Sequence, residues 1–134
     1  MTDKCVTLVT AGSMQEAKRI ATRLVESRLA ACVNIVGRVL SIYRWKGKVT
    51  DGKEVLLLIK SKRNSFAEVV KIVRANHSYT TPEIISIPVI DGSQDYLAWI
   101  DASTKAAGRR AVGRKSRGKD VRNKRRSASR GPNG

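Results

Sequence analysis

The stretch "EVLLLIK", residues 54–60, decides the fold. In a β-strand, Val55, Leu57 and Ile59 point to one side of the sheet, and the two intervening leucines point to the other. Because both sets are apolar, the sequence predicts a strand inside a sheet with apolar surface on both of its faces. Each face therefore needs a covering layer, which the rest of the sequence has to supply.

Two further strands precede this one. The first is "CVTLVTA", Cys5–Ala11, and the second is the long, β-branched and aromatic "ACVNIVGRVLSIYRW", Ala31–Trp45. The internal Gly37 predicts a bulge or a bend in the second strand. The segment "KGKVTDGK", residues 46–53, contains two glycines and is typical of a hairpin connection. We therefore expect it to join the long strand to the strand of residues 54–60.

Two amphipathic helices are predicted, and each begins at a sequence pattern typical of a capping box. The first box is Ser13 with Glu16, and the second is Ser65 with Glu68. Behind each box, apolar residues recur at helical spacing with charged residues between them. The apolar stripe of the first helix consists of Ala17, Ile20, Ala21, Leu24 and Val25, and that of the second consists of Phe66, Val69, Val70 and Val73, flanked by Ile72.

A fourth strand and a short closing helix complete the pattern. The strand is "IISIPVI", Ile84–Ile90, and its Pro88 has no N–H for a ladder, which favours a position at the sheet edge. The closing helix is "DYLAWIDAS", residues 95–103. The order β-α-β-β-α-β is that of the ferredoxin-like split βαβ arrangement of the α+β class, with two helices on one face of the sheet.

Two helices on one face leave the other apolar face of residues 54–60 without a cover. Monomeric proteins avoid large contiguous apolar patches on their surface. We favour self-association as the remedy, and the alternative is that the closing helix covers the second face.

The charge of the chain is concentrated near its C-terminus. Residues 105–134 hold 12 Lys or Arg and one Asp, a net charge of +11, and the first 104 residues hold 15 Lys or Arg and 10 acids, a net charge of +5, which gives the +16 of the whole chain. The last segment has no aromatic residue and no sustained apolar stripe. We therefore predict a folded domain over 1–104 and a disordered basic tail over 105–134, and such a tail is a candidate for binding nucleic acid.

Several protein classes are not indicated by the sequence. Cys5 and Cys32 show no CxxC or paired spacing, which suits a reducing compartment. The N-terminus lacks the pattern of a signal peptide, and the longest apolar run is too short to span a bilayer. We expect a cytoplasmic protein without membrane association. The motifs of phosphate-binding loops and serine hydrolases do not occur, and we expect no enzyme.

The chemistry-bearing residues are few. His77, in "HSYTTPE", is the only histidine, and a lone loop histidine is more often structural or exposed than a metal ligand. Its candidate partners are Cys32 and Glu83, although a small buried hydrophobe is the preferred interpretation of Cys32. Tyr43 and Trp45 alternate onto one face of the long strand. They suit either base stacking or a subunit interface, and we favour the interface.

Five stretches together resemble the CutA divalent-cation tolerance family. They are "ACVNI" at 31–35, "SIYRWKGK" at 41–48, "EVLLLIKS" at 54–61, "HSYTTPEII" at 77–85 and "IPVIDGSQDYLAWI" at 87–100. The resemblance runs from Cys5 to Ser103. It implies a ferredoxin-like fold related to the PII signalling proteins, a homotrimer, a role in tolerance to copper and other divalent metals, and no established enzymatic reaction.

The resemblance also implies sites between subunits. Of the family's metal ligands the resemblance carries over only His77, and with Cys32 and Glu83 as its candidate partners we expect a divalent metal ion, copper favoured, to bind there. The expected ligand cleft is lined by Tyr43, Trp45, Lys60 and Tyr79. Two departures weaken the metal site: Val9 and Asn76 stand where the family's best-known bacterial member has a cysteine and a second histidine. Donors from neighbouring subunits would have to restore it. A polyanion-binding protein and a scaffold without a ligand are the competing hypotheses.

Overall fold

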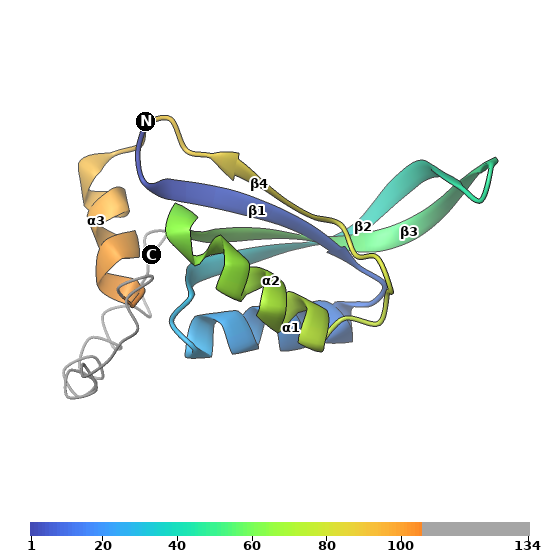
Figure 1. The fold of residues 1–134 in the computed structure, drawn as a ribbon, viewed down its shortest axis with the longest axis horizontal. Helices are drawn as coiled ribbons and strands as arrows, with labels where there is room; N and C mark the ends of the chain where they lie inside the picture. Colours follow the sequence, from blue (N-terminus) through green and yellow to red (C-terminus); the bar gives the residue numbers. More distant parts are fainter. Residues whose placement is uncertain (106–134) are drawn as a thin grey trace.

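The computed structural model describes residues 1–105, in which four antiparallel strands form one sheet (Figure 1). The strand order is β2-β3-β1-β4. The strands are β1 (Lys4–Ala11), β2 (Ala30–Trp45), β3 (Lys48–Lys62) and β4 (Ile84–Pro88), and the helices are α1 (Met14–Glu26), α2 (Phe66–Ala75), which follows the 3₁₀ turn η1 (Arg63–Ser65), and α3 (Gln94–Ser103). The predicted ferredoxin-like arrangement is confirmed, and the predicted tail lies, apart from Lys105, outside the described residues.

The core lies between the sheet and the pair α1 and α2, which cover the same face (Figure 1). Its centre consists of fully buried aliphatic side chains: Val9, Ile20, Leu24, Leu57, Ile59, Val69 and Val73. The three strand residues in this set share one side of the sheet because side chains alternate along a strand. The predicted apolar stripes are confirmed at these positions, but Val25 is exposed and does not belong to the stripe of α1.

The two predicted capping boxes are only partly formed. Ser13 caps α1, and its Oγ accepts a hydrogen bond from the backbone N–H of Glu16 at 3.1 Å. The reciprocal half is absent, because the Glu16 carboxylate accepts instead from the backbone N–H of Ser78. The second box was predicted wrongly: Ser65 makes no side-chain hydrogen bond to α2, which continues directly from η1.

The β2–β3 hairpin is longer than the sequence predicted. Its turn is confined to Lys46 and Gly47, which have φ values of 51° and 80° and so match a two-residue turn with two positive φ angles. The strand β3 therefore begins at Lys48, and most of the predicted connection is paired strand. The predicted bulge at Gly37 is confirmed, since the register shifts between Val36 and Val39. Beyond it, residues 39–53, called the arm below, project from the body of the molecule (Figure 1).

The strand β4 lies at a sheet edge, as Pro88 predicted, and it ends at that proline. No helix within residues 1–105 is both long enough and apolar enough to cross a membrane.

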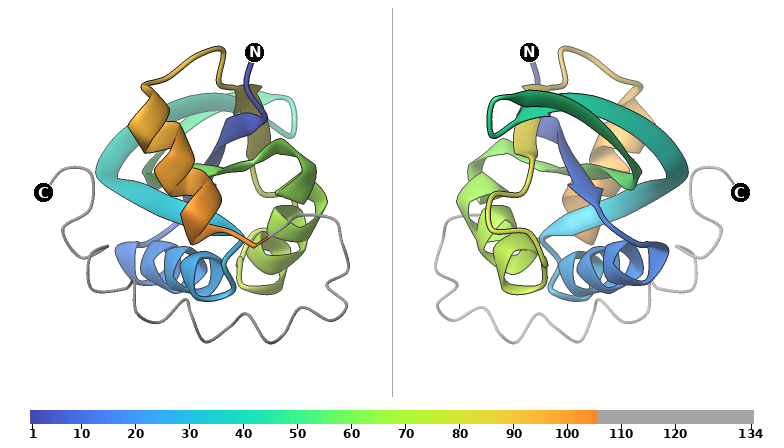
Figure 2. Two further views of the ribbon diagram at one scale, coloured as in Figure 1. Left: turned by 90° about the vertical axis from the view of Figure 1, so that its left-hand side faces the viewer. Right: turned by 90° about the vertical axis from the view of Figure 1, so that its right-hand side faces the viewer.

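The face of the sheet opposite α1 and α2, called the open face below, is covered only in part. Strand register places the side chains of Val6, Leu8, Val36, Leu56, Leu58, Ile85 and Ile87 on it. The helix α3 packs at the end of this face that lies away from the arm (Figure 2). Ile85 and Ile87 stay about half exposed, at 53% and 49%. The predicted alternative, a closing helix that covers the second face, therefore holds for one end only.

Candidate functional site

The loop that joins α2 to β4 is held against the body by His77. The His77 side chain is fully buried, although its backbone leaves the residue partly exposed. Its Nε2 lies 2.7 Å from the carbonyl oxygen of Thr10, and its Nδ1 accepts a hydrogen bond from the backbone N–H of Tyr79 at 3.0 Å. These partners fit the neutral tautomer with the proton on Nε2, which donates to Thr10. Both ring nitrogens are thus used within one protomer.

A carboxylate of α1 completes this anchor. Glu16 has a nearly buried side chain, and its Oε2 accepts from the backbone N–H of Ser78 at 3.2 Å. The same oxygen lies 3.3 Å from Nδ1 of His77. Because a buried carboxylate needs hydrogen-bond donors, the loop supplies what Glu16 requires and is fixed by it in return.

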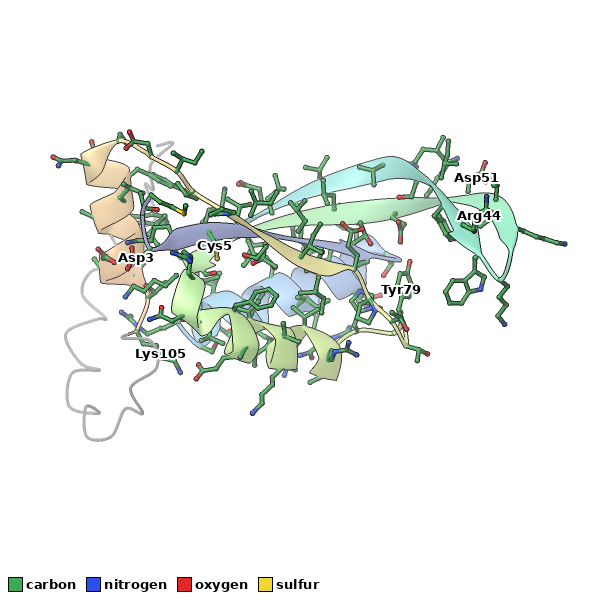
Figure 3. The ribbon with its side chains drawn as sticks, turned by 45° about the horizontal axis from the view of Figure 1, so that its top comes forward. Asp3, Cys5, Arg44, Asp51, Tyr79 and Lys105 are labelled. Atoms are coloured by element: carbon green, nitrogen blue, oxygen red, sulfur yellow. The ribbon has the colours of Figure 1, made fainter. Side chains whose placement is uncertain are left out.

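Tyr79 extends the network to β3. Its hydroxyl donates to Oε2 of Glu54 at 2.9 Å, and its ring centroid lies 4.7 Å from that of His77. Figure 3 shows where Tyr79 lies in the molecule. Burial and then the hydrogen bond to the Glu54 carboxylate raise the pKa of Tyr79 to about 12, with a smaller effect from Tyr43. The phenol is therefore a hydrogen-bond donor across the neutral pH range.

The predicted metal ligands do not meet in one protomer. His77 lies in the network above, whereas Cys32 lies on β2 with its Sγ 4.0 Å from Nζ of Lys60. Glu83 is exposed just before β4 and makes no ion pair among residues 1–105. The described part of the chain holds no cluster of three His, Cys, Asp or Glu residues able to hold a metal ion.

The two positions at which the sequence departs from the family do not supply ligands either. Val9 is fully buried in the core, and the side-chain amide of Asn76 donates to the carbonyl of Ile72. Within residues 1–105 of one protomer, the side chains thus do not fit a divalent ion. Metal binding by His77, Cys32 and Glu83 stays a prediction that requires donors from more than one protomer.

The four residues of the predicted ligand cleft divide into separate places. Tyr43 lies on the arm with its hydroxyl beside Gly52, and Tyr79 lies in the loop, where it donates to Glu54. Trp45 is 56% exposed near the tip of the arm, where Nζ of Lys46 lies 5.9 Å from its ring centroid. Lys60 lies elsewhere, beside Cys32 and Asn34. A single cleft containing all four is therefore not present within one protomer.

Three partners of the loop were not predicted: Thr10, Glu16 and Glu54. Glu16 carried a signal that pointed to the wrong partner, because a glutamate three residues after a serine is also the mark of a capping box. Glu54 was visible as a carboxylate at the head of an apolar strand. Thr10 contributes only its backbone carbonyl, for which side-chain patterns give no signal.

Comparison with known proteins gives consistent matches over the folded part. The family model for the CutA1 divalent ion tolerance protein matches residues 5–103. The chain is 46% identical over 99 residues to the divalent-cation tolerance protein CutA of Thermus thermophilus, which covers 74% of this chain and 96% of that protein. It is 41% identical over 100 residues to the chloroplastic protein CutA of Arabidopsis thaliana, covering 75% of this chain and 55% of that protein.

Solved structures agree with these matches. The Cut A1 structure from Thermus thermophilus superposes with a TM-score of 0.74 at 45% identity, covering 76% of this chain and 99% of that chain. The CutA structure from Xylella fastidiosa gives a TM-score of 0.75 at 34% identity, covering 78% and 100%. Residues 5–103, which the family model matches, include the arm, the His77 loop and most of the open face.

Proposed function

The chain belongs to the CutA1 divalent ion tolerance family, and on that basis we propose that it acts in divalent-cation tolerance as a homotrimer. In this proposal, a divalent ion, with copper the first to test, or a small ligand binds in the cleft between subunits. The proposed activity is binding, and we assign no chemical reaction to it.

The trimer proposal is supported by apolar side chains that stay exposed in a single protomer. On the arm, Leu40, Ile42 and Val49 are 61%, 70% and 67% exposed. On the open face, Ile85 and Ile87 are 53% and 49% exposed. Burial of one such side chain contributes about 1.5–3 kcal/mol. The arm and the open face thus each expose apolar side chains, and soluble monomers avoid large patches of such surface.

A cyclic assembly suits the shape of this surface. The arm and the open face are different patches on different parts of the protomer (Figure 1). When unlike patches meet head to tail, the contact is heterologous, and it closes into a ring if the rotation allows. In a closed ring of three, each protomer presents both patches and has both covered.

The metal proposal follows from the same assembly. Imidazole, thiolate and carboxylate groups suit copper and zinc, and the three predicted donors are separated within one protomer. Calorimetric titration of the purified chain with copper tests the proposal. We expect that His77→Ala abolishes binding and that Thr80→Ala, an exposed position in the same loop, preserves it.

Loss of loop structure is a competing reason for a loss of copper binding in His77→Ala. Cys32→Ser and Glu83→Gln address it, because neither residue holds the loop, and each is expected to weaken copper binding. Copper affinity that is unchanged in all three variants would remove these residues from any metal site.

A second candidate function rests on the charge of residues 105–134, which is +11 per chain and +33 in a trimer. We propose that this segment binds nucleic acid without sequence preference, because basic side chains release counterions from phosphates. Fluorescence anisotropy with a labelled duplex is expected to show binding that falls steeply with salt and that is lost in a chain ending at Lys105. Equal binding by both chains would contradict this proposal.

We also propose a cytoplasmic location, since the free cysteines Cys5 and Cys32 suit a reducing compartment. The relative from Archaeoglobus fulgidus is described as periplasmic, so the location needs its own test. Fractionation of cells that produce the full chain would place the protein, and recovery outside the cytoplasm would contradict the proposal.

A further inference from the structure

The open face carries a lysine whose charge is not balanced by a carboxylate among residues 1–105. Lys4, Lys60 and Lys62 share this face by strand register. Lys4 pairs with Asp3 and lies 3.0 Å from Asp101 of α3, and Lys62 lies 3.8 Å from the same carboxylate. Lys60 has no carboxylate within ion-pair distance among residues 1–105, and its side-chain partners there are Asn34 and Cys32.

The position of Lys60 makes this imbalance costly in the proposed trimer. Lys60 is half buried, next to Leu58 on the open face. Covering the face with a second protomer would remove more water from the ammonium group. Removing water from an unpaired charge is unfavourable, and a carboxylate in good geometry offsets most of that cost. The covering protomer is therefore expected to bring a carboxylate.

Most carboxylates near the sheet are already engaged. Asp101 serves Lys4 and Lys62, Glu54 accepts from Tyr79, and Glu16 is held by the His77 loop. Glu83 is different. It is exposed directly before β4, next to the exposed open-face residues of that strand, and no hydrogen bond or ion pair of its carboxylate occurs among residues 1–105.

Lys60 and Glu83 are too far apart to pair within one protomer. In the sheet, Lys60 is level with Val6 of β1, and Val6 is level with Ile87 of β4. Glu83 precedes Ile87 by four residues, which is about 13 Å along an extended chain. A heterologous contact brings different parts of two protomers together, so these two groups are suited to meet between protomers.

We propose that in the homotrimer Lys60 forms an ion pair with Glu83 of the partner subunit. The inference rests on the proposed trimer and adds a specific contact to it. In a closed ring without bound metal the contact occurs at each interface, so all Lys60 and Glu83 side chains are paired. The second copy thus covers the apolar residues of the open face and also supplies the carboxylate that pairs with Lys60.

Charge reversal tests this pair. Lys60→Glu brings two carboxylates together at each interface, and Glu83→Lys brings two ammonium groups together. We expect each single variant to raise the trimer dissociation constant at least tenfold in sedimentation experiments, and the double variant, which restores opposite charges, to recover most of the wild-type value. Glu26→Lys on the outer side of α1 makes the same change of charge away from the open face and should leave assembly unchanged.

Mixing the single variants shows whether the pair lies between protomers. In a trimer that contains both variants, two of three interfaces hold opposite charges, whereas trimers of either variant alone hold none. An equimolar mixture should therefore assemble more strongly than either variant. Far-ultraviolet circular dichroism checks that the variants are folded, and Lys60→Gln with Glu83→Gln serve as milder variants.

The outcomes separate this inference from the proposed function. A wild-type chain that sediments as a monomer would overturn the trimer and the ion pair together. A wild-type trimer with single variants that assemble normally, or with a double variant that fails to recover, would overturn the ion pair alone.

Discussion

Glu16 shows how one residue can satisfy a local sequence pattern and yet serve a distant segment. Its backbone N–H completes the cap of Ser13, but its carboxylate binds the loop that carries His77. The cap was predictable because it depends on residues three positions apart. The loop contact was not, because Glu16 and Ser78 are 62 positions apart in the chain, and only the fold brings them together.

The candidate site was predictable in its location but not in its bonding. The sequence identified His77 and Tyr79 as the residues of interest in their loop. It did not indicate that the imidazole would be saturated by a carbonyl and a backbone N–H, since neither partner is a side chain. The sequence also did not predict that Lys60 lies apart from Tyr79, because positions along a long strand can be compared only when the strand register is known.

The hydrogen bond between Tyr79 and Glu54 predicts a pH dependence. The pKa of Tyr79 is raised from 10.0 to about 12 in the folded protein. Between these values the folded state keeps a proton that the unfolded state releases, so stability from this group is present below pH 10 and is lost as pH rises through about 12. Glu54→Gln should bring the pKa back toward 10.0, because it removes the carboxylate.

Ultraviolet absorbance of tyrosinate measures this effect. Subtracting the titration of Tyr79→Phe from that of the wild type isolates the signal of Tyr79. A difference curve centred near the ordinary tyrosine pKa, with no change in Glu54→Gln, would show that the contact is not formed in solution.

At the scale of elements, the helices and strands were predicted well where the pattern is repetitive. Both long helices and all four strands occur, because periodic burial determines them. The hairpin was misjudged for a physical reason: Val49, Thr50, Asp51 and Gly52 have a mixed composition typical of a loop, yet each pairs across the hairpin with β2. Pairing with the aromatic end of β2 extends the strand beyond what local propensity indicates.

The cap of α1 gives a test of local stability. Ser13→Ala removes the hydrogen bond to the N–H of Glu16 and should lower the free energy of unfolding by about 1 kcal/mol. Ser93→Ala is the matched control, since Ser93 occupies the same position before α3 without a side-chain cap bond. Denaturant unfolding at one fixed protein concentration compares them, and equal losses would contradict the assignment of the cap.

The arm gives a test of assembly. Ile42 is 70% exposed in the protomer, so Ile42→Asp should leave the fold intact but raise the trimer dissociation constant at least tenfold. Val25→Asp makes the same change at an exposed apolar position on α1, away from the arm, and should leave assembly unaffected. Analytical ultracentrifugation distinguishes the two, and a trimer that tolerates both variants equally would exclude the arm from the interface.

At the scale of the whole molecule, one face of the sheet is covered by helices and the other is covered only in part. The pair α1 and α2 buries a continuous core on one face, whereas α3 covers only an end of the opposite face (Figure 2). Three features stay incomplete within one protomer: the partly covered open face, the exposed apolar residues of the arm, and Lys60, which has no ion pair among residues 1–105. A second copy of the chain accounts for these three features together.

The most direct test of this account is the mass of the native protein in solution. Sedimentation equilibrium of the full chain at micromolar concentration, with salt high enough to screen the basic segment, measures it without a label. The account predicts a single species with three times the chain mass of 14.7 kDa. A species of 14.7 kDa that persists as the concentration is raised would contradict it.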